Sequence, residues 1–321
     1  MVVKLDDLDR RLIHALAIDG RASFSRIAEV IGVSDQTIAR RYRRLRATGA
    51  ARVVGHSYAY RVGDVRWYMR LRCTPDAVLP IANALAKRPD TFWVHVVSGG
   101  TEINCVTQAR SSDDSDELLL QKLPRTPQIL DVTAHNLLHT FFGGEVEHPG
   151  LIDSLTHPQA EALRPPRCTP RTVTLDDADH RMIDALGEDG RAGYATLAAA
   201  SGWSESTVKR RLDYLRHAGV VYYDVDVDTK SLGFLSEARL WMSVLPSQLV
   251  AVGEALAKHP EVAFAAAVTG PTNLVASVVC KDIRALYSYL TERIGALTAI
   301  RQIETAPIIR TVKRGRTIVN P

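Results

Sequence analysis

Arginines crowd one short segment of the chain, VSDQTIARRYRRLRATGA, which runs from Val33 to Ala50. Guanidinium groups bind phosphate oxygens through parallel hydrogen bonds, so several of them on one helix are suited to gripping a nucleic-acid backbone. A solvated charged face is the more common explanation of a single arginine-rich helix. The place of this segment within its module decides between the two interpretations.

Three helices are predicted around the segment. Apolar residues at helical spacing predict helices over 6–19 and 23–31, and Ser34 is a good N-cap for a third helix that ends at Thr48. Gly49 stands at the position where a left-handed residue most often ends a helix. The second and third helices, joined by a short turn at Gly32, predict a helix-turn-helix whose last helix enters the major groove.

The third helix has one apolar stripe, Ile38, Tyr42 and Leu45, which predicts its buried face. Its polar residues turn away from that stripe and suit contacts to phosphates and base edges. The predicted DNA-binding residues of this helix and of its counterpart in a second copy are Ser34, Gln36, Thr37, Arg40, Arg41, Arg43, Arg44, Ser204, Ser206, Thr207, Lys209, Arg210 and Arg211.

The second copy is plain in the sequence. The residues from Leu5 to Ala50 return without a gap from Leu175 to Val220, with 21 of 46 positions identical. The chain is therefore a tandem of two units. We call the third helix of each copy its reading helix. In the second reading helix the buried stripe is Val208, Leu212 and Leu215, and Asp213 and Tyr214 face outward with the basic residues. The first copy is thus expected to supply more of the phosphate affinity.

A strand-rich module follows each helical module. Its pattern predicts strand, helix, two strands joined as a hairpin, helix and strand, which is the ferredoxin-like βαββαβ order. The fold class is α+β. The predicted division is a helix-turn-helix domain over 1–55, a ferredoxin-like domain over 64–142, a linker over 143–173, a second helix-turn-helix domain over 174–225, a second ferredoxin-like domain over 234–313 and a tail over 314–321. An apolar sheet face without helices predicts assembly with other chains into a homo-oligomer.

Composition limits the remaining possibilities. The chain has 321 residues, 46% of them hydrophobic, and a net charge of only +4, so a nucleic-acid partner must be argued from the distribution of charge. No signal peptide and no membrane-spanning apolar run is evident, which predicts a cytoplasmic protein without a membrane partner. The four cysteines show no ligand spacing, and we expect neither a metal nor a cofactor.

The repeated stretches LDDLDRRLIHAL and DGRASFSRIAEVIGVSDQTIARRYRRLRATGA, with their partners in the second copy, resemble the Lrp/AsnC (feast/famine) family of bacterial transcription regulators. The resemblance implies a helix-turn-helix that reads double-stranded DNA as a dimer, an effector-sensing module of βαββαβ topology, and assembly of dimers into rings. Here a single chain is similar to two family members fused, so it resembles a covalent pseudo-dimer.

The resemblance also implies a small-molecule effector, an amino acid in many members, bound near the hairpin of the strand-rich module. Many members carry Asp where this chain has Glu102 and Asn273. Glycine backbone and small hydroxyl groups suit a small zwitterion, although a hairpin turn needs glycine in any case. The matching positions are Ser98, Gly99, Thr101, Glu102, Thr269, Gly270, Thr272 and Asn273.

Two other classes of function compete with a regulator. The siroheme decarboxylases also pair Lrp/AsnC-like modules, but of their aromatic and histidine-containing hairpin only His95 remains here, so we expect no enzyme and no catalytic residues. His135 and His139 stand four residues apart in a predicted strand, which places them on one face at distant positions, and no third ligand is near, so we expect no metal there. An architectural DNA-binding protein without an effector would have the same helices and an inert hairpin.

Overall fold

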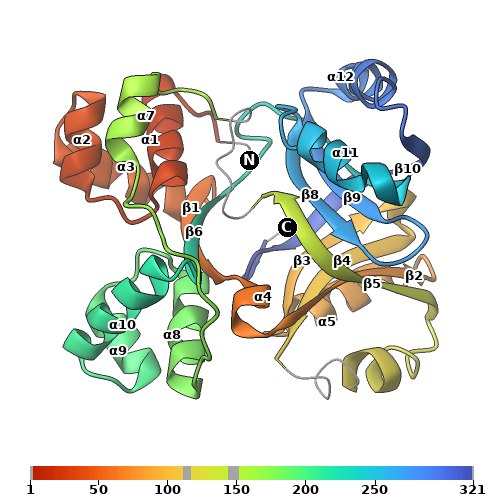
Figure 1. Cartoon of the computed structure of the whole chain (residues 1–321), viewed down its shortest axis with the longest axis horizontal. Helices are drawn as coiled ribbons and strands as arrows, with labels where there is room; N and C mark the ends of the chain where they lie inside the picture. Colours follow the sequence, from red (N-terminus) through yellow and green to blue (C-terminus); the bar gives the residue numbers. More distant parts are fainter. Residues whose placement is uncertain (1–2, 111–116, 144–151, 320–321) are drawn as a thin grey trace. The chain divides into compact units, whose positions relative to one another are not determined.

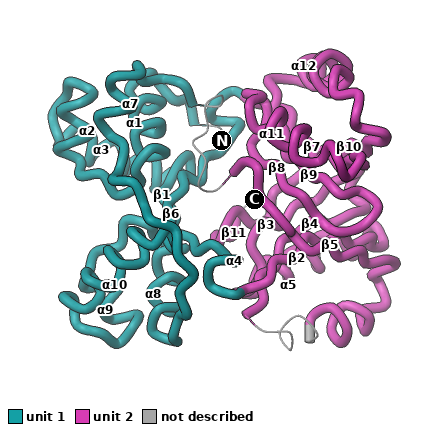
Figure 2. The backbone as a smooth tube through the Cα atoms, viewed as in Figure 1, with its two compact units in different colours: residues 1–63, 144–233 teal, residues 64–143, 234–321 magenta. Residues whose placement is uncertain are grey.

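The structure is a computed structural model that describes residues 3–110, 117–143 and 152–319 (Figure 1). The chain divides into two compact units, each made of one piece from either half of the sequence (Figure 2). Unit 1 comprises residues 1–63 and 144–233, and unit 2 comprises residues 64–143 and 234–321. Each unit therefore pairs the like modules of the two copies. The six-part division by chain order remains our proposal for the sequence modules.

Unit 1 holds the two helical modules. An aspartate caps the first helix of each copy, because the side chains of Asp6 and Asp176 accept a hydrogen bond from the third residue of the helix in a capping box. The elements of the first piece are α1 (Asp7–Ile18), α2 (Phe24–Ile31), α3 (Asp35–Ala47), β1 (Ala51–Ser57) and α4 (Ala59–Val62), and those of the second are α7 (His157–Leu163), α8 (Asp177–Glu188), α9 (Tyr194–Ser201), α10 (Glu205–His217) and β6 (Val221–Val227).

A two-stranded ladder joins the two helical modules. Strands β1 and β6 pair antiparallel from Ala51 opposite Val227 to Ser57 opposite Val221. Each strand directly follows the reading helix of its own copy, so the ladder fixes the two reading helices within one unit. In Figure 1 the helices of the two copies lie to either side of this ladder. The sequence did not predict either strand.

Part of the predicted linker is ordered against the first module. Helix α7 contacts α1 and α2, and the side chain of Gln159 donates to the carbonyl of Val30 at 2.9 Å. Just before it, the backbone N–H groups of Ser154 and Leu155 donate to Nδ1 of His14 at 3.1 and 3.0 Å. The linker residues 144–151 lie outside the described residues.

Unit 2 holds two ferredoxin-like modules, as the sequence predicted. Their strand orders are equivalent, β3-β4-β2-β5 in the first copy and β8-β9-β7-β10 in the second. The first contains β2 (Val65–Cys73), α5 (Val78–Ala86), β3 (Thr91–Val97), η1 (Ser98–Gly100), β4 (Glu102–Ala109), η2 (Glu117–Lys122) and β5 (Ile129–Phe142). The second contains β7 (Ser236–Val244), η3 (Pro246–Gln248), α11 (Leu249–Leu256), β8 (Val262–Val268), β9 (Leu274–Cys280), α12 (Ile283–Ser288), η4 (Tyr289–Ile294) and β10 (Ile300–Arg314), followed by β11 (Thr317–Ile318) in the predicted tail. The second helix of the predicted order corresponds to η2 in the first copy, and residues 111–116, which precede η2, lie outside the described part.

The last strand of each module crosses from its own sheet to the other. Strand β5 pairs with β2 up to Asn136 and with β8 from Leu137 onward. Strand β10 pairs with β7 up to Pro307 and with β3 from Ile308 onward. The eight main strands therefore form a closed ring of pairings that leaves neither module with its own independent sheet edge.

The sheet of each module has one face without helices, and these two faces cover each other. Tyr68 and Trp241 are buried between the sheets, with ring centroids 4.9 Å apart and planes at 85°. They form a cluster with Ala266, Val268 and Val275. Our argument that an uncovered apolar sheet face drives assembly with other chains is therefore wrong, because the second copy in the same chain covers that face. Among the described residues, no helix is long and apolar enough to cross a membrane.

The contact between the modules of unit 1 predicts a strong dependence on side-chain volume at Gly190. A Cβ at Gly190 would stand 2.8 Å from the carbonyl carbon of Val54 on β1, whereas at Gly193 nothing lies within 4 Å. We expect Gly190→Ser to cost about 1–3 kcal/mol of the free energy of unfolding, as overpacking usually does. Gly193→Ser should be neutral or stabilising because it adds an N-cap to α9. Denaturant unfolding followed by circular dichroism compares the two, and equal effects would contradict the packing described here.

Candidate nucleic-acid interface

Serine caps begin both reading helices. The hydroxyl of Ser34 accepts from the N–H of Thr37 at 3.2 Å, and that of Ser204 accepts from the N–H of Thr207 at 3.3 Å. Each serine hydroxyl also lies within 3.0 Å of the threonine hydroxyl of its own helix. These four predicted DNA-binding residues therefore also fix the start of each helix.

The buried faces of both helices are as the sequence predicted. Ile38, Tyr42 and Leu45 are buried, as are their counterparts on α10, and the other residues of each helix are half-buried or exposed. Four of the predicted contact residues on α3 are exposed away from its buried stripe, namely Gln36, Arg40, Arg43 and Arg44, and so are Ser206, Lys209 and Arg210 on α10.

Arg41 and Arg211 form ion pairs within their own modules. The Arg211 guanidinium binds the fully buried carboxylate of Asp179 at 2.8 and 2.6 Å, and Arg41 binds the equivalent buried Asp9 at 3.1 Å. Helical periodicity alone placed these arginines among the DNA contacts. Because each one joins the reading helix to the first helix of its module, we withdraw both from the proposed contact set.

Asp9 also binds a second guanidinium. Its carboxylate also pairs with Arg44, whose side chain remains 45% exposed, and Arg41 in turn pairs with Asp6. The hydrogen bond from Arg41 lowers the pKa of the Asp6 carboxyl. Asp6 therefore stays ionised to lower pH than an isolated aspartate, and this ion pair is lost as pH falls through that lowered pKa. Asp9 and Asp179 were missed, although both stand in the repeated Leu-Asp-Asp-x-Asp start of the two copies.

Equivalent arginines join the two modules across the β1–β6 ladder. Arg21 donates to the carbonyl of Gly190 at 3.0 Å, and the equivalent Arg191 donates to the carbonyl of Gly20 at 2.6 Å. An ion pair between Arg46 and Asp189 at 2.9 Å has its counterpart in Arg216 with Asp19 at 3.4 Å. Two reading helices related by pseudo-two-fold symmetry are thus held together by reciprocal contacts.

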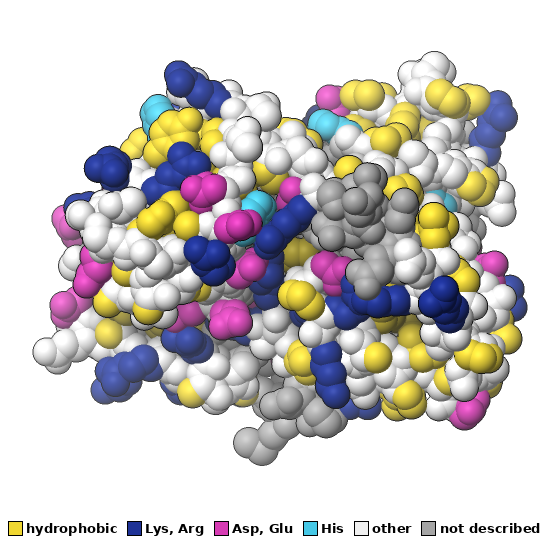
Figure 3. Space-filling view, turned by 90° about the horizontal axis from the view of Figure 1, so that it is seen from below, with side chains coloured by type: hydrophobic (Ala, Val, Ile, Leu, Met, Phe, Trp, Pro, Cys, Tyr) yellow, Lys and Arg dark blue, Asp and Glu magenta, His cyan; other side chains and the backbone are white. Residues whose placement is uncertain are grey.

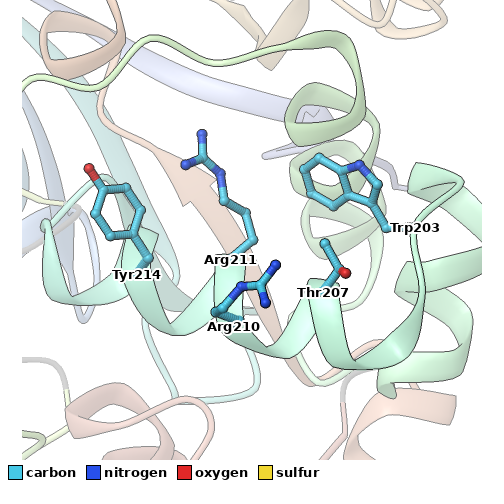
Figure 4. A pocket seen from close by; sticks show the side chains of 5 residues that line it. All are labelled: Trp203, Thr207, Arg210, Arg211 and Tyr214. Atoms are coloured by element: carbon cyan, nitrogen blue, oxygen red, sulfur yellow. The ribbon is translucent and has the colours of Figure 1, made fainter.

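The exposed faces of the two helices nevertheless differ in charge. At equivalent positions α3 carries Arg43 and Arg44 where α10 carries Asp213 and Tyr214. Beside α10 lies a hollow lined by Trp203, Thr207, Arg210, Arg211 and Tyr214 (Figure 4). Basic and acidic side chains also alternate over the molecular face in Figure 3, in keeping with the small net charge. Between the two helices, the basic character is greater on α3.

The predicted effector residues form two separate groups in unit 2. In the first hairpin Ser98 and Gly99 have positive φ angles of 54° and 75°, and Thr101 is exposed. Glu102 is buried and binds the guanidinium of Arg70 at 2.7 and 3.0 Å. The carboxylate of Glu102 therefore already neutralises a cation of the protein itself.

The second hairpin is bound to strand β5 of the first copy. The hydroxyl of Thr269 accepts from the N–H of Asn136 at 2.8 Å, and its carbonyl lies 2.5 Å from Nδ1 of His135. The amide of Asn273 bonds both backbone groups of Val244, at 2.8 and 2.9 Å. Gly270 is exposed and Thr272 is half-buried. Exposed backbone and hydroxyl groups, rather than Glu102 or Asn273, are the groups that an effector could contact.

Of the histidines singled out in the sequence, His95 contacts a residue of the other copy. His95 is buried, and its Nδ1 lies 3.1 Å from the hydroxyl of Thr311. Burial, with the nearby charges of Arg239 and Arg314, holds the pKa of His95 well below its usual value, so the ring is neutral at pH 7. Within the described ranges, no group of three or more His, Cys, Asp or Glu side chains is placed to hold a metal ion.

Comparison with known proteins gives the class of the chain. The model of the AsnC-type helix-turn-helix domain matches residues 5–46 and again residues 175–216, and the model of the Lrp/AsnC ligand-binding domain matches residues 237–318. The HTH-type transcriptional regulator Rv2324 of Mycobacterium tuberculosis is 33% identical over 140 residues, which are 42% of this chain and 92% of that protein. The uncharacterized HTH-type transcriptional regulator PH0140 of Pyrococcus horikoshii is 30% identical over 145 residues, covering 45% of this chain and 91% of that protein. The chain belongs to the Lrp/AsnC family, and the double match of the first model supports a tandem fusion.

Among solved structures, that of the siroheme decarboxylase NirDL covers 98% of this chain and 94% of its own, with a TM-score of 0.65 and 13% sequence identity. This likeness extends over both copies and shows a shared fold. It corrects our expectation that the chain is not an enzyme, because an enzyme has this same paired architecture. Absence of the decarboxylase hairpin motif was too narrow a ground for that exclusion.

The buried ion pairs predict which aspartates support the interface. We expect Asp179→Asn to lower the free energy of unfolding by about 1–3 kcal/mol, since it leaves the Arg211 guanidinium without its charged partner. Asp213→Asn, on the exposed side of the same helical module, should change it by less than about 0.5 kcal/mol. Denaturant titration measures both, and a loss as large for Asp213→Asn as for Asp179→Asn would contradict the assignment.

Proposed function

We propose that the protein is a sequence-specific DNA-binding transcription regulator that carries both halves of a family dimer in one chain. One observation carries the proposal: two helix-turn-helix modules, each with an exposed basic reading helix, are held together in unit 1 by β1 and β6. A major-groove reader of palindromic type needs two such helices at a fixed spacing. Relatives that are named HTH-type transcriptional regulators support the same function.

The contacts divide by chemistry. Arg40, Arg43 and the exposed part of Arg44 bind phosphates and fix the register of α3, while Lys209 and Arg210 do so for α10. Gln36, Thr37, Ser206 and Thr207 approach base edges in the major groove. We further propose that unit 2 senses a small molecule, such as an amino acid, at the exposed backbone of the two hairpins.

Assembly of several chains also belongs to this proposal. Large apolar side chains are exposed on the helices of the second ferredoxin-like module, with Val250 60%, Ile283 71% and Tyr287 68% exposed. Covering them in a homo-oligomer would bury apolar area that the ring of strands leaves open. Light scattering at micromolar concentration tests this proposal, and a monomer at all concentrations would contradict it.

The function itself is tested by fluorescence anisotropy with the DNA upstream of the protein's own gene and a shuffled duplex of equal composition. We expect tighter binding to the native fragment, and a linear fall of log affinity with log salt concentration. A panel of amino acids added to the same assay separates a sensor from an architectural protein, which would show no shift. Equal weak binding to both duplexes would contradict the regulator, and the visible spectrum with added siroheme would then become the first test.

The unlike charges of the two helices predict unequal contributions to affinity. Arg40→Ala should weaken binding more than Arg210→Ala on the same operator, because α10 also presents the carboxylate of Asp213 to the phosphates. Each phosphate contact that is lost should lower the slope of log affinity against log salt by about one. Lys87→Ala, exposed at the end of α5 in unit 2, is the matched control and should leave both quantities unchanged. An equal loss for the two arginine variants would contradict the asymmetry.

A further inference from the structure

The hollow beside α10 has an aromatic lining that its counterpart beside α3 lacks. The hollow next to α10 measures ≈340 Å³ and is lined by Trp203, Thr207, Arg210, Arg211 and Tyr214. The counterpart next to α3 measures ≈270 Å³ and is lined by Asp6, Arg40, Arg41 and Arg44. At the positions of Trp203 and Tyr214 the first copy has Val33 and Arg44. The hollow beside α10 thus combines two arginines with two rings and a threonine, whereas only charged residues line the hollow beside α3.

The rings are presented to solvent in a fixed arrangement. Figure 4 shows Trp203 and Tyr214 at the two ends of the hollow, with Thr207 and Arg211 between them. The guanidinium of Arg211 lies over the Tyr214 ring, 5.3 Å from its centroid, and is itself anchored by buried Asp179. Tyr214 is 44% exposed and Trp203 is half-buried. Tyr214 is therefore open to solvent, while Trp203 packs on one side against the core of its module and lines the hollow with the rest of its ring.

The chemistry of the major groove decides what such a surface fits. Thymine alone among the four bases presents a methyl group there, and apolar side chains recognise it by contact. Guanidinium groups instead pair with O6 and N7 of guanine or with phosphate. The hollow flanks the outward face of α10, beside the exposed Arg210, so a base that meets this helix also meets the rings.

We propose that α10 recognises its half-site through thymine methyl groups, which contact Trp203, Thr207 and Tyr214, whereas α3, with Val33 and Arg44 in place of the two rings, does not. This proposal rests on the proposed function and adds the base chemistry of each half-site. The operator is then asymmetric in base composition as well as in affinity.

The test begins with selection of bound duplexes from a randomised pool by the intact chain. Thymines of each selected half-site are then replaced, one at a time, by deoxyuridine, which removes only the methyl group. We expect about a four-fold loss of affinity for each contacted methyl in one half-site, the change that about 0.8 kcal/mol per buried carbon corresponds to. Replacements in the other half-site should cost less than about 1.5-fold.

Two variants assign the methyl-sensitive half-site to α10. Tyr214→Arg and Trp203→Val each install the residue that the first copy carries at that position within the same fold. Either one should remove the deoxyuridine penalty, and Arg44→Ala, which changes α3, should leave it intact. A penalty that is equal in both half-sites, absent, or unchanged in both α10 variants overturns this inference while leaving DNA binding in place. Failure to enrich any duplex overturns the proposed function itself.

Discussion

Pairing between the first copy and the second, within one chain, is the constraint on which the rest of the structure depends. In unit 1 the β1–β6 ladder and the reciprocal bonds of Arg21 and Arg191 hold the two reading helices together. In unit 2 the strands β5 and β10 each complete the sheet of the opposite copy. The apolar clusters of unit 2 draw residues from both halves of the sequence, so each half completes its core with side chains of the other.

Where equivalent positions of the two copies contact each other, they can carry different residue types, because both positions belong to one chain. Tyr68 and Arg239 occupy equivalent places on β2 and β7, and the Arg239 guanidinium lies 5.4 Å from the Tyr68 ring centroid. Arg70 likewise lies over the ring of its counterpart Trp241, at 4.9 Å. In a symmetric dimer of one copy, identical residues would meet at these points, so one arginine would face another arginine. Fusion therefore permits cation–π contacts in the core and unlike reading helices on the surface.

Periodicity and capping signals predicted the helices, the ferredoxin-like order and the buried stripes, since these depend on neighbours within a few residues. What the sequence did not give depends on residues far away. Strands β1 and β6 are short and pair across about 170 residues. The side of the helix on which Arg41 lies is set by local periodicity, but its partner Asp9 belongs to another helix. The sheet face expected to bind another chain is likewise covered by a residue as distant as Trp241. The aromatic hollow could have been found from Trp203 and Tyr214, which replace Val33 and Arg44 in the repeat.

The central claim is that two unlike reading helices, fixed in one unit, bind an operator in a single orientation. The most direct measurement tethers a DNA-cleaving reagent to α3 through Gln36→Cys or to α10 through Ser206→Cys. Both are made in a Cys168→Ser chain, because the other three cysteines are buried. Cleavage confined to one half-site from α3 and to the other half-site from α10 is the predicted result. Equal cleavage of both half-sites from each position would contradict the account.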